Sequence, residues 1–367
     1  MKRIYNFSAG PSVLPYSVLE KAQAELTSYK NTGISVLEMS HRSNTFEEIL
    51  AETEQLLRKL MNIPTHYQVL FLQGGASLQF SMVPYNLFHQ TNHAYYAHTG
   101  MWSNRAIQEA KKMGEVTVIC SSEDKSFTYI PPINLPDAPA ADYIHITTNN
   151  TVEGTRYPTL PESHSIPIVA DMSSNILSEV YDVSKFGVIY AGAQKNIGPA
   201  GLTIVIIRDD LLGKSRSDCP TMLNYTTHVK AKSLYHTPPT FSIYMTKLVL
   251  EWLIQQGGVS TIEQVNKEKA HLLYTFLDDS LLFTSKVFPE HRSYMNIPFT
   301  TNDEKLDQLF IQSASSHGFV ELKGHRSTGG MRASLYNAMP IEHVRKLVEF
   351  MKWFEQSHKM GGAYVSY

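Results

Sequence analysis

Hydrophobic positions along the chain follow two periods, one typical of short buried strands and the other of helices. Apolar runs of strand length occur at 69–72, 93–98, 115–119, 143–147, 166–171, 186–192 and 202–208. Helical periodicity separates several of these runs, at 45–61, 77–88 and 102–113. Alternating strands and helices are typical of α/β proteins, because a crossover helix lets the next strand run parallel. We therefore predict a mostly parallel central sheet flanked by helices.

Capping signals predict where two long helices begin. Thr45 and Glu48 have the spacing of a capping box, so we expect the helix over 45–61 to start there. Ser260 and Glu263 have the same spacing, and we expect them to cap another long helix.

The C-terminal third of the chain has a different pattern. The polar stretch 209–233 is too long for a simple turn, and we interpret it as a functional loop. An apolar helix is predicted over 242–256, and a domain boundary follows near residue 260. Strand and helix patterns then alternate at 295–300, 303–317, 319–324, 330–335 and 340–358. This alternation predicts a smaller C-terminal α/β domain.

Composition excludes several classes of protein. Hydrophobic residues make up 43% of the 367 positions and charged residues 18%, as in a soluble globular enzyme. A net charge of −2 provides no general attraction for nucleic acid or an anionic membrane. Cys120 and Cys219 are too few for a disulfide framework and lie in no metal-binding spacing. The polar N-terminus is no secretory signal. We expect a cytoplasmic protein without a metal.

Lys195 and Asp171 are the strongest candidates for chemistry. An isolated loop lysine is more often a solvated surface residue. The strand predicted over 186–192 runs directly into Lys195, however, and Asp171 ends the strand over 166–171. Both side chains can therefore enter one crevice at the carboxyl ends of the strands. Such a pair suits a cofactor that needs an amine for an imine and a carboxylate for a pyridine nitrogen.

A phosphate site is indicated more weakly. Residues 74–77 (Gly-Gly-Ala-Ser) lie between a predicted strand and a helix, where backbone N–H groups can hold an anion. An ordinary turn without a ligand explains this motif equally well. Trp102 offers a stacking platform for a flat ring, and a buried core tryptophan is the equally good alternative.

Together these motifs resemble the phosphoserine aminotransferase family, a class-V aminotransferase family of fold type I that depends on pyridoxal 5'-phosphate (PLP). The resemblance covers essentially the full chain. The ordered motifs are NFSAGPSVLP at 6–15, MSHRS at 39–43, QGGASLQF at 73–80, NNTVEG at 149–154, ADMSSN at 170–175, GAQKN at 192–196, HTPPTFSIY at 236–244 and GHRSTGGMRAS at 324–334. The resemblance implies the fold of these enzymes, with a large PLP-binding domain at 16–260. It also implies a small domain at 261–367 that the N-terminal segment 1–15 joins.

The resemblance assigns the cofactor contacts. It implies that Lys195 carries PLP as an imine, that Asp171 pairs with the pyridine nitrogen, and that Trp102 stacks on the ring. The other implied contacts are Ala76, Ser77, Thr151 and Gln194, with His236 and Thr237 from the neighbouring subunit of a homodimer. Some relatives carry Arg where Ser77 stands and Asn where His236 stands. Backbone N–H groups can still donate at 76 and 77.

The resemblance also implies the reaction and the substrate site. L-glutamate would pass its amino group to 3-phosphohydroxypyruvate, giving O-phospho-L-serine and 2-oxoglutarate in serine biosynthesis. A phosphorylated substrate of pyridoxine biosynthesis is a further expectation. Arg332 would bind the α-carboxylate, and a second cationic group would bind the phosphate or the distal carboxylate of glutamate: His41, Arg42, His325 and Arg326. Taken alone, each arginine is more often an ordinary surface charge.

Three alternatives remain open at this point. The chain can be an aminotransferase for an unphosphorylated substrate, or a cysteine desulfurase that uses Cys219. It can also be a binding module that has kept the fold without catalysis. Cys219 has no recognisable activating neighbours in the sequence, and Lys195 argues against a module without catalysis.

Overall fold

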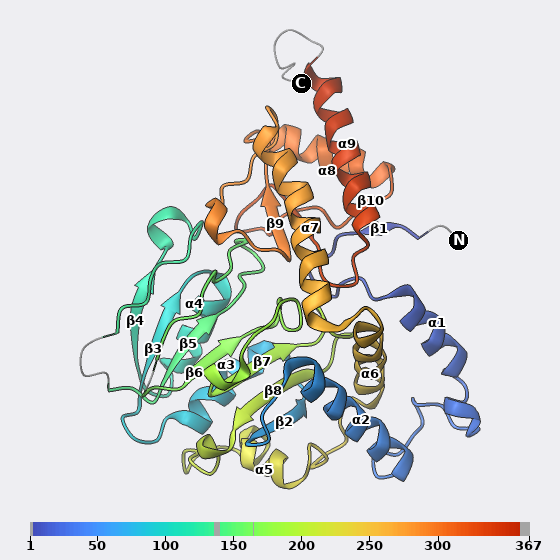
Figure 1. Ribbon diagram of the computed structural model, residues 1–367. Helices are drawn as coiled ribbons and strands as arrows, with labels where there is room; N and C mark the ends of the chain where they lie inside the picture. The colour runs from blue at the N-terminus through green and yellow to red at the C-terminus, as the bar shows by residue number, and fades with distance from the viewer. Residues whose placement is uncertain (1–2, 136–139, 164, 360–367) are drawn as a thin grey trace.

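The computed structural model describes residues 3–135, 140–163 and 165–359. Within these ranges a seven-stranded sheet has the order β2-β8-β7-β6-β5-β3-β4 (Figure 1). Its strands are β2 (Tyr67–Leu72), β3 (His93–His98), β4 (Glu115–Ser121), β5 (Tyr143–Thr147), β6 (Ile168–Asp171), β7 (Val188–Gly192) and β8 (Thr203–Arg208). β8 is antiparallel to both of its neighbours, and the other pairs are parallel. The prediction of a mostly parallel sheet is confirmed.

Helices cover both faces of this sheet because its inner strands are apolar on both sides. The helices of this part are α1 (Tyr16–Glu25), α2 (Asn44–Met61), α3 (Gly75–Leu87), α4 (Met101–Ala110), α5 (Tyr225–Lys230) and α6 (Thr240–Gln255). Ile144 and Ile189 share a core with buried residues of α1, α2 and α6. Tyr143 and Tyr190 face the opposite core, with residues of α3 and α4.

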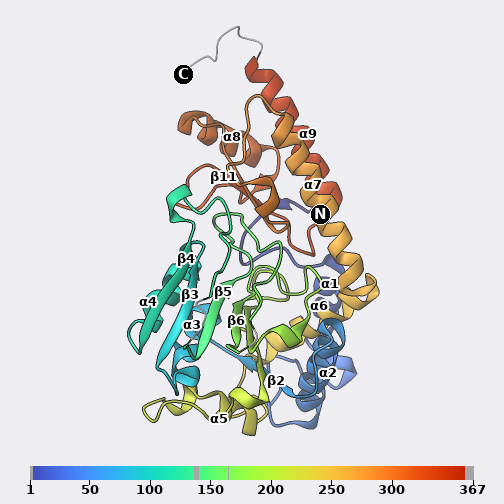
Figure 2. The ribbon, with the colours of Figure 1, turned by 60° about the vertical axis from the view of Figure 1, so that its left-hand side comes forward.

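A third core lies beyond the large sheet. α7 (Gly258–Asp279) leads into it and packs beside α9 (Ile341–Lys359), as Figures 1 and 2 show. The other elements are β9 (Asn296–Phe299), α8 (Glu304–Ser316), β10 (Phe319–Val320) and β11 (Met331–Ser334). β11 pairs antiparallel with β9, whereas β1 (Tyr5–Asn6) pairs parallel with β10. In the described ranges, no helix is long and apolar enough to cross a membrane.

The predicted capping box of α2 is wrong. Ser43 is the N-cap, and its side chain accepts a hydrogen bond from the Phe46 amide at 3.3 Å. Thr45 therefore lies inside the first turn, because the helix begins at Asn44. Several polar residues in a row can each serve as a cap, and their order does not reveal which one does.

Two other local predictions also need correction. α7 begins after Gly257, whose φ of 94° favours glycine, and Ser260 lies inside the helix. Glu263 instead accepts a hydrogen bond from the Val180 amide at 3.0 Å. The stretch 209–233 is not a continuous loop, because α5 forms within it.

Candidate active site

The carboxyl ends of β6 and β7 meet where the sequence places its strongest candidates. Asp171 is the last residue of β6, and Gly192 ends β7 just before Lys195. Ser173 joins the two strand ends: its hydroxyl donates to Asp171 Oδ1 at 2.6 Å and accepts from the Gly192 amide at 3.2 Å. Parallel strands therefore deliver both side chains to one edge of the sheet.

The Lys195 amine lies in a well-defined environment. Its Nζ donates to Thr151 Oγ1 at 2.6 Å and lies 5.3 Å from the centre of the Trp102 ring. Burial lowers the pKa of Lys195 to about 8, and the positive charge of Arg332 acts in the same direction. Asp171 opposes this change because its negative charge favours the ammonium form. A substantial fraction of the amine is thus neutral, and nucleophilic, near neutral pH.

Asp171 is a buried carboxyl group with 4% exposure. Burial raises the pKa of Asp171, while Lys195 and the hydrogen bonds from Ser173 act to lower it. The Ser173 amide and hydroxyl both donate to Oδ1. Oδ2 therefore remains for a cationic donor such as a protonated ring nitrogen.

The N-terminus of α3 lies at the same edge. Gly74 is the N-cap with φ of 91°, and no side chain caps the helix. The Ala76 amide is 3.7 Å from where a Cβ on Gly192 would lie. Ser77 is exposed. The first amides of α3 thus lie beside the strand that leads to Lys195, where they can hold an anion.

The cationic candidates fall into two sets. Arg332, on β11, donates to the Thr151 carbonyl at 3.1 Å and so joins the Lys195 cluster. Burial, followed by the charges of Arg332 and Arg326, lowers the pKa of His325. These three cationic residues therefore lie close to one another.

The other candidates make no described contact with the Lys195 side chain. His41 and Arg42 precede α2, and no described contact joins them to Lys195 or Arg332. His236 forms a hydrogen bond with Gln73 Oε1 at 2.7 Å, directly before the α3 turn. Thr237 beside it is exposed. Gln194 is held by its carbonyl, which accepts from the Ser12 amide at 2.9 Å.

Glu153 and Ser173 were missed as individual site residues. Glu153 is 8% exposed, and its Oε1 accepts from the Met101 amide at 2.8 Å at the start of α4. Its Oε2 is buried without a hydrogen-bond partner among the described residues. Both residues lie inside motifs that point to the family, NNTVEG and ADMSSN, so the sequence did mark the segments that contain them. Only the folded contacts distinguish them from their neighbours.

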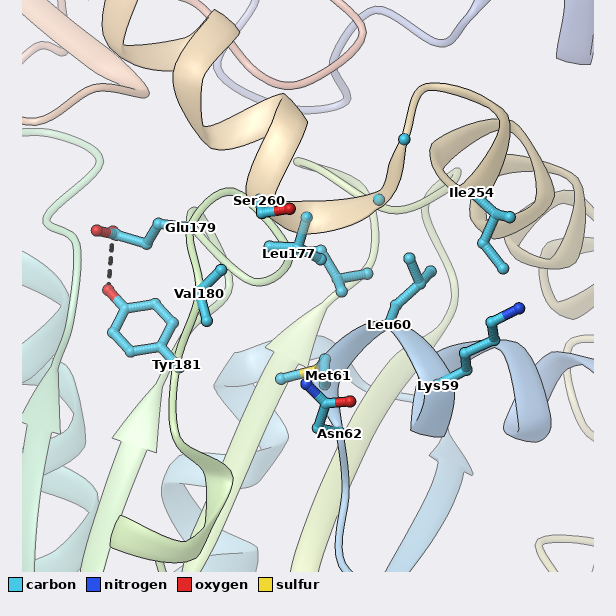
Figure 3. Close-up of a pocket in the computed structure, with 13 residues that line it drawn as sticks. Lys59, Leu60, Met61, Asn62, Leu177, Glu179, Val180, Tyr181, Ile254 and Ser260 are labelled. Carbon is cyan, nitrogen blue, oxygen red and sulfur yellow. Dashed lines mark hydrogen bonds between the residues drawn. The ribbon is translucent and has the colours of Figure 1, made fainter.

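A cavity of about 510 Å³ lies elsewhere, where α2, the 177–181 segment and the start of α7 meet (Figure 3). None of the site residues named above lines it. Glu179 and Tyr181 are hydrogen-bonded to each other at its side. Among the described residues, no group of three His, Cys, Asp or Glu side chains could hold a metal ion.

The residues at the sheet edge fit PLP. Lys195 offers an amine whose pKa is near 8, and Asp171 offers a buried carboxylate. Trp102 offers an aromatic face, and its buried Nε1 has no hydrogen-bond partner in the described chain. The uncapped α3 N-terminus suits a phosphate group. These four features match an aldehyde, a pyridine nitrogen, a flat ring and a phosphate.

Comparison with known proteins decides the family. The model of the aminotransferase class-V family matches residues 4–347. The chain belongs to the class-V aminotransferase family. Curated relatives of this enzyme are named phosphoserine aminotransferase. One from Bacillus cereus is 62% identical over 360 residues, covering 98% of this chain and 100% of the relative. One from Listeria monocytogenes is 57% identical and covers 98% of this chain and 99% of the relative.

Solved structures agree with the fold of this aminotransferase. The phosphoserine aminotransferase of Bacillus circulans subsp. alkalophilus has a TM-score of 0.95 and 46% identity, covering 97% of this chain and 99% of that one. A PLP-bound phosphoserine aminotransferase of Trichomonas vaginalis has a TM-score of 0.89 and 37% identity, covering 95% and 100%. The enzyme is therefore a PLP-dependent aminotransferase with the fold type I architecture.

Proposed function

We propose that this enzyme is a phosphoserine aminotransferase. It moves the amino group of L-glutamate to 3-phosphohydroxypyruvate and gives O-phospho-L-serine and 2-oxoglutarate, a step of serine biosynthesis. The observation that supports this best is the chain of contacts from Lys195 through Thr151 to Arg332. These contacts connect Lys195, whose amine has a lowered pKa, to Arg332, the cation that would bind the substrate carboxylate. The names of the full-length relatives support the same substrate.

In this proposal Lys195 and Asp171 carry the chemistry. PLP, when bound, supplies an electron sink for the bonds at the substrate α-carbon. Lys195 holds the cofactor, and its amine takes the proton from the α-carbon of the amino donor and returns one to the acceptor. The Asp171 carboxylate keeps the pyridine nitrogen protonated. The other proposed cofactor contacts are Ala76, Ser77, Trp102, Thr151 and Gln194, with His236 and Thr237 from a second subunit.

The substrate site separates two anions. Arg332 binds the α-carboxylate that every amino acid has, and its contact with the Thr151 carbonyl holds it beside Lys195. The phosphate, or the distal carboxylate of glutamate, is bound by the other cationic residues: His41, Arg42, His325 and Arg326. Guanidinium groups suit both anions because they donate two parallel hydrogen bonds.

We also propose that the enzyme is a homodimer with shared sites. Large apolar side chains are exposed along the segment from α1 to α2, with 59% exposure for Tyr16, 50% for Ile34 and 62% for Leu37. Contact with a second copy would cover them and bring its Arg42 to Lys195. Mixing Lys195→Ala with Arg42→Ala subunits should restore part of the activity, because one site of the mixed dimer keeps both residues. No rescue despite demonstrated subunit exchange would contradict the shared site.

The proposed domain division and location follow the same resemblance. We propose a large PLP-binding domain at 16–260, a small domain at 261–367 and an N-terminal segment at 1–15 that joins the small domain. Pairing of β1 with β10 supports the last assignment. The two free cysteines suit a reducing cytoplasm, which we propose as the location.

A cysteine desulfurase is the weaker assignment. Burial, with a smaller effect of Asp218, raises the pKa of Cys219, whereas a nucleophilic thiol needs the opposite change. Its segment is anchored by Arg216, which donates to the Met113 carbonyl at 2.8 Å just before β4 begins. Cys219 therefore lies near the amino ends of the parallel strands, on the edge opposite Lys195.

The decisive experiment follows the absorbance of the PLP-loaded enzyme. Addition of L-glutamate should convert the spectrum to that of the aminated cofactor, and 3-phosphohydroxypyruvate should restore it. Serine and alanine serve as matched amino donors without phosphate. Equal rates with phosphoserine, serine and alanine would contradict the substrate assignment while leaving the aminotransferase family intact.

A further inference from the structure

The arginines of this protein differ in whether they form an ion pair with a carboxylate. Among the described residues, six of the eleven arginines form an ion pair with a carboxylate: Arg58, Arg156, Arg208, Arg216, Arg292 and Arg345. Arg3 donates to the Leu14 carbonyl. The other four form no ion pair among the described residues, although the charge of Glu153 acts on Arg332: Arg42, Arg105, Arg326 and Arg332. Three of these four belong to the proposed substrate site, and Arg105 has no assigned role.

Arg105 lies over Trp102 and makes no ion pair with its helical neighbour. The acidic residue one turn further along α4 is Glu109, which instead contacts Lys112 at 2.7 Å and Ser81 at 3.3 Å. The Arg105 guanidinium lies 4.9 Å from the centre of the Trp102 ring, and Lys195 Nζ lies 5.3 Å from the same centre. Arg105 and Lys195 are thus separated by no more than the sum of these distances.

A second observation connects Arg105 to the cationic residues of the small domain. The positive charge of Arg105 helps to lower the pKa of His325, after burial and the charges of Arg332 and Arg326. Four cationic side chains from two parts of the fold therefore converge, and no carboxylate contributes to the shift of His325. Mutually repelling cations near one point favour binding of a multiply charged anion.

We propose that Arg105 is a specificity-determining residue that binds the phosphate of the substrate from the Trp102 side of the site. This inference rests on the proposed phosphoserine aminotransferase activity. The exposed Arg105 guanidinium lies on α4 over Trp102, 4.9 Å from the ring centre, and its charge also acts on His325. A phosphate dianion attracts it more strongly than the single charge of a distal carboxylate does.

The test compares Arg105→Met with Arg105→Lys and with Lys111→Met in the PLP-loaded enzyme. Met keeps an alkyl chain against Trp102 and removes the charge, whereas Lys keeps the charge. Lys111→Met removes an exposed cation just after α4 and serves as the matched control. We expect Arg105→Met to raise KM for phosphoserine roughly tenfold, with a smaller change for glutamate and none for alanine. Inhibition by inorganic phosphate should weaken in parallel, and Arg105→Lys should recover most of both losses.

The possible outcomes separate this inference from the proposed function. If the unaltered enzyme shows no preference for phosphoserine over serine, the proposed function fails first. If it does prefer phosphoserine and Arg105→Met keeps that preference and its phosphate inhibition, the role of Arg105 is refuted. Equal losses for phosphoserine and alanine would assign Arg105 to support of Trp102 and would likewise refute phosphate binding.

Discussion

The protonation state of Lys195 provides a direct test of the active-site geometry. A pKa of about 8 leaves about one amine in five neutral at pH 7.4, whereas the ordinary value of 10.5 leaves about one in a thousand. The structure attributes this change first to burial, and Asp171 is the leading opposing charge. Asp171→Asn should therefore move the Lys195 pKa further down, because it removes a charge that favours the ammonium form. An unperturbed fold is expected, since an amide oxygen can still accept the hydrogen bonds from Ser173.

Competitive acetylation of the PLP-free protein at a series of pH values, followed by mass spectrometry of the Lys195 peptide, measures this titration. Peptides that carry exposed lysines provide the internal standard in the same digest. Half-maximal labelling of Lys195 is expected near pH 8 in the unaltered protein and at lower pH in Asp171→Asn. Labelling that follows the exposed lysines, or a rise in Asp171→Asn, would refute the reasoning. Either result would mean that burial and Asp171 do not control this amine.

Three other predictions concern stability and pH. Gly100→Ala should lower the free energy of unfolding by about 1–3 kcal/mol in denaturant titrations, because its Cβ would lie 2.6 Å from Glu153 Oε2; unchanged stability would contradict that packing. Because burial and neighbouring cations lower the pKa of His325, phosphate binding should draw a proton onto it, so phosphoserine affinity should rise from about pH 8 to 6.5. His325→Gln should flatten that profile in binding titrations, and an identical profile would exclude His325. Burial lowers the pKa of Lys269 to about 7, below its unfolded value, so the unfolded chain binds more protons and stability should rise between about pH 7 and 10. Lys269→Met should reduce this slope in thermal unfolding at several pH values, and an equal slope would contradict it.

The strands of the large sheet and its mostly parallel character were predictable, because buried strands leave continuous apolar runs. The predicted helices were right in their bodies and not at their ends, and α1 was not predicted. Ser43, and not Thr45, caps α2, since adjacent polar residues compete for that position. Gly257 starts α7 where Ser260 was expected, because glycine at positive φ needs no side-chain cap. α5 was missed because six residues carry too little periodicity to stand out.

The candidate site was predictable only where strand order alone brings residues together. Asp171 and Lys195 follow neighbouring parallel strands, so their meeting follows from the sheet. Arg332 reaches the Thr151 carbonyl from a separate core, and no pattern along the chain indicates that contact. The position of Glu153 was also not predictable from the chain. It is buried under the start of α4, where only a glycine at position 100 leaves room for its carboxylate. The roles assigned to these residues remain predictions for the experiments above.

Arg105 shows why charge pairing has to be taken from the structure. Several arginines have an acidic residue close in sequence that does pair with them, as Arg208 does with Asp210 and Arg58 with Glu54. Arg105 has Glu109 at the same helical spacing as the second pair, so sequence alone would assign it an ordinary surface ion pair. Glu109 contacts Lys112 instead, and Arg105 lies over Trp102. A surface ion pair contributes little to the free energy of unfolding, so the absence of an Arg105–Glu109 pair has almost no effect on stability. It leaves the positive charge of Arg105 free for a ligand.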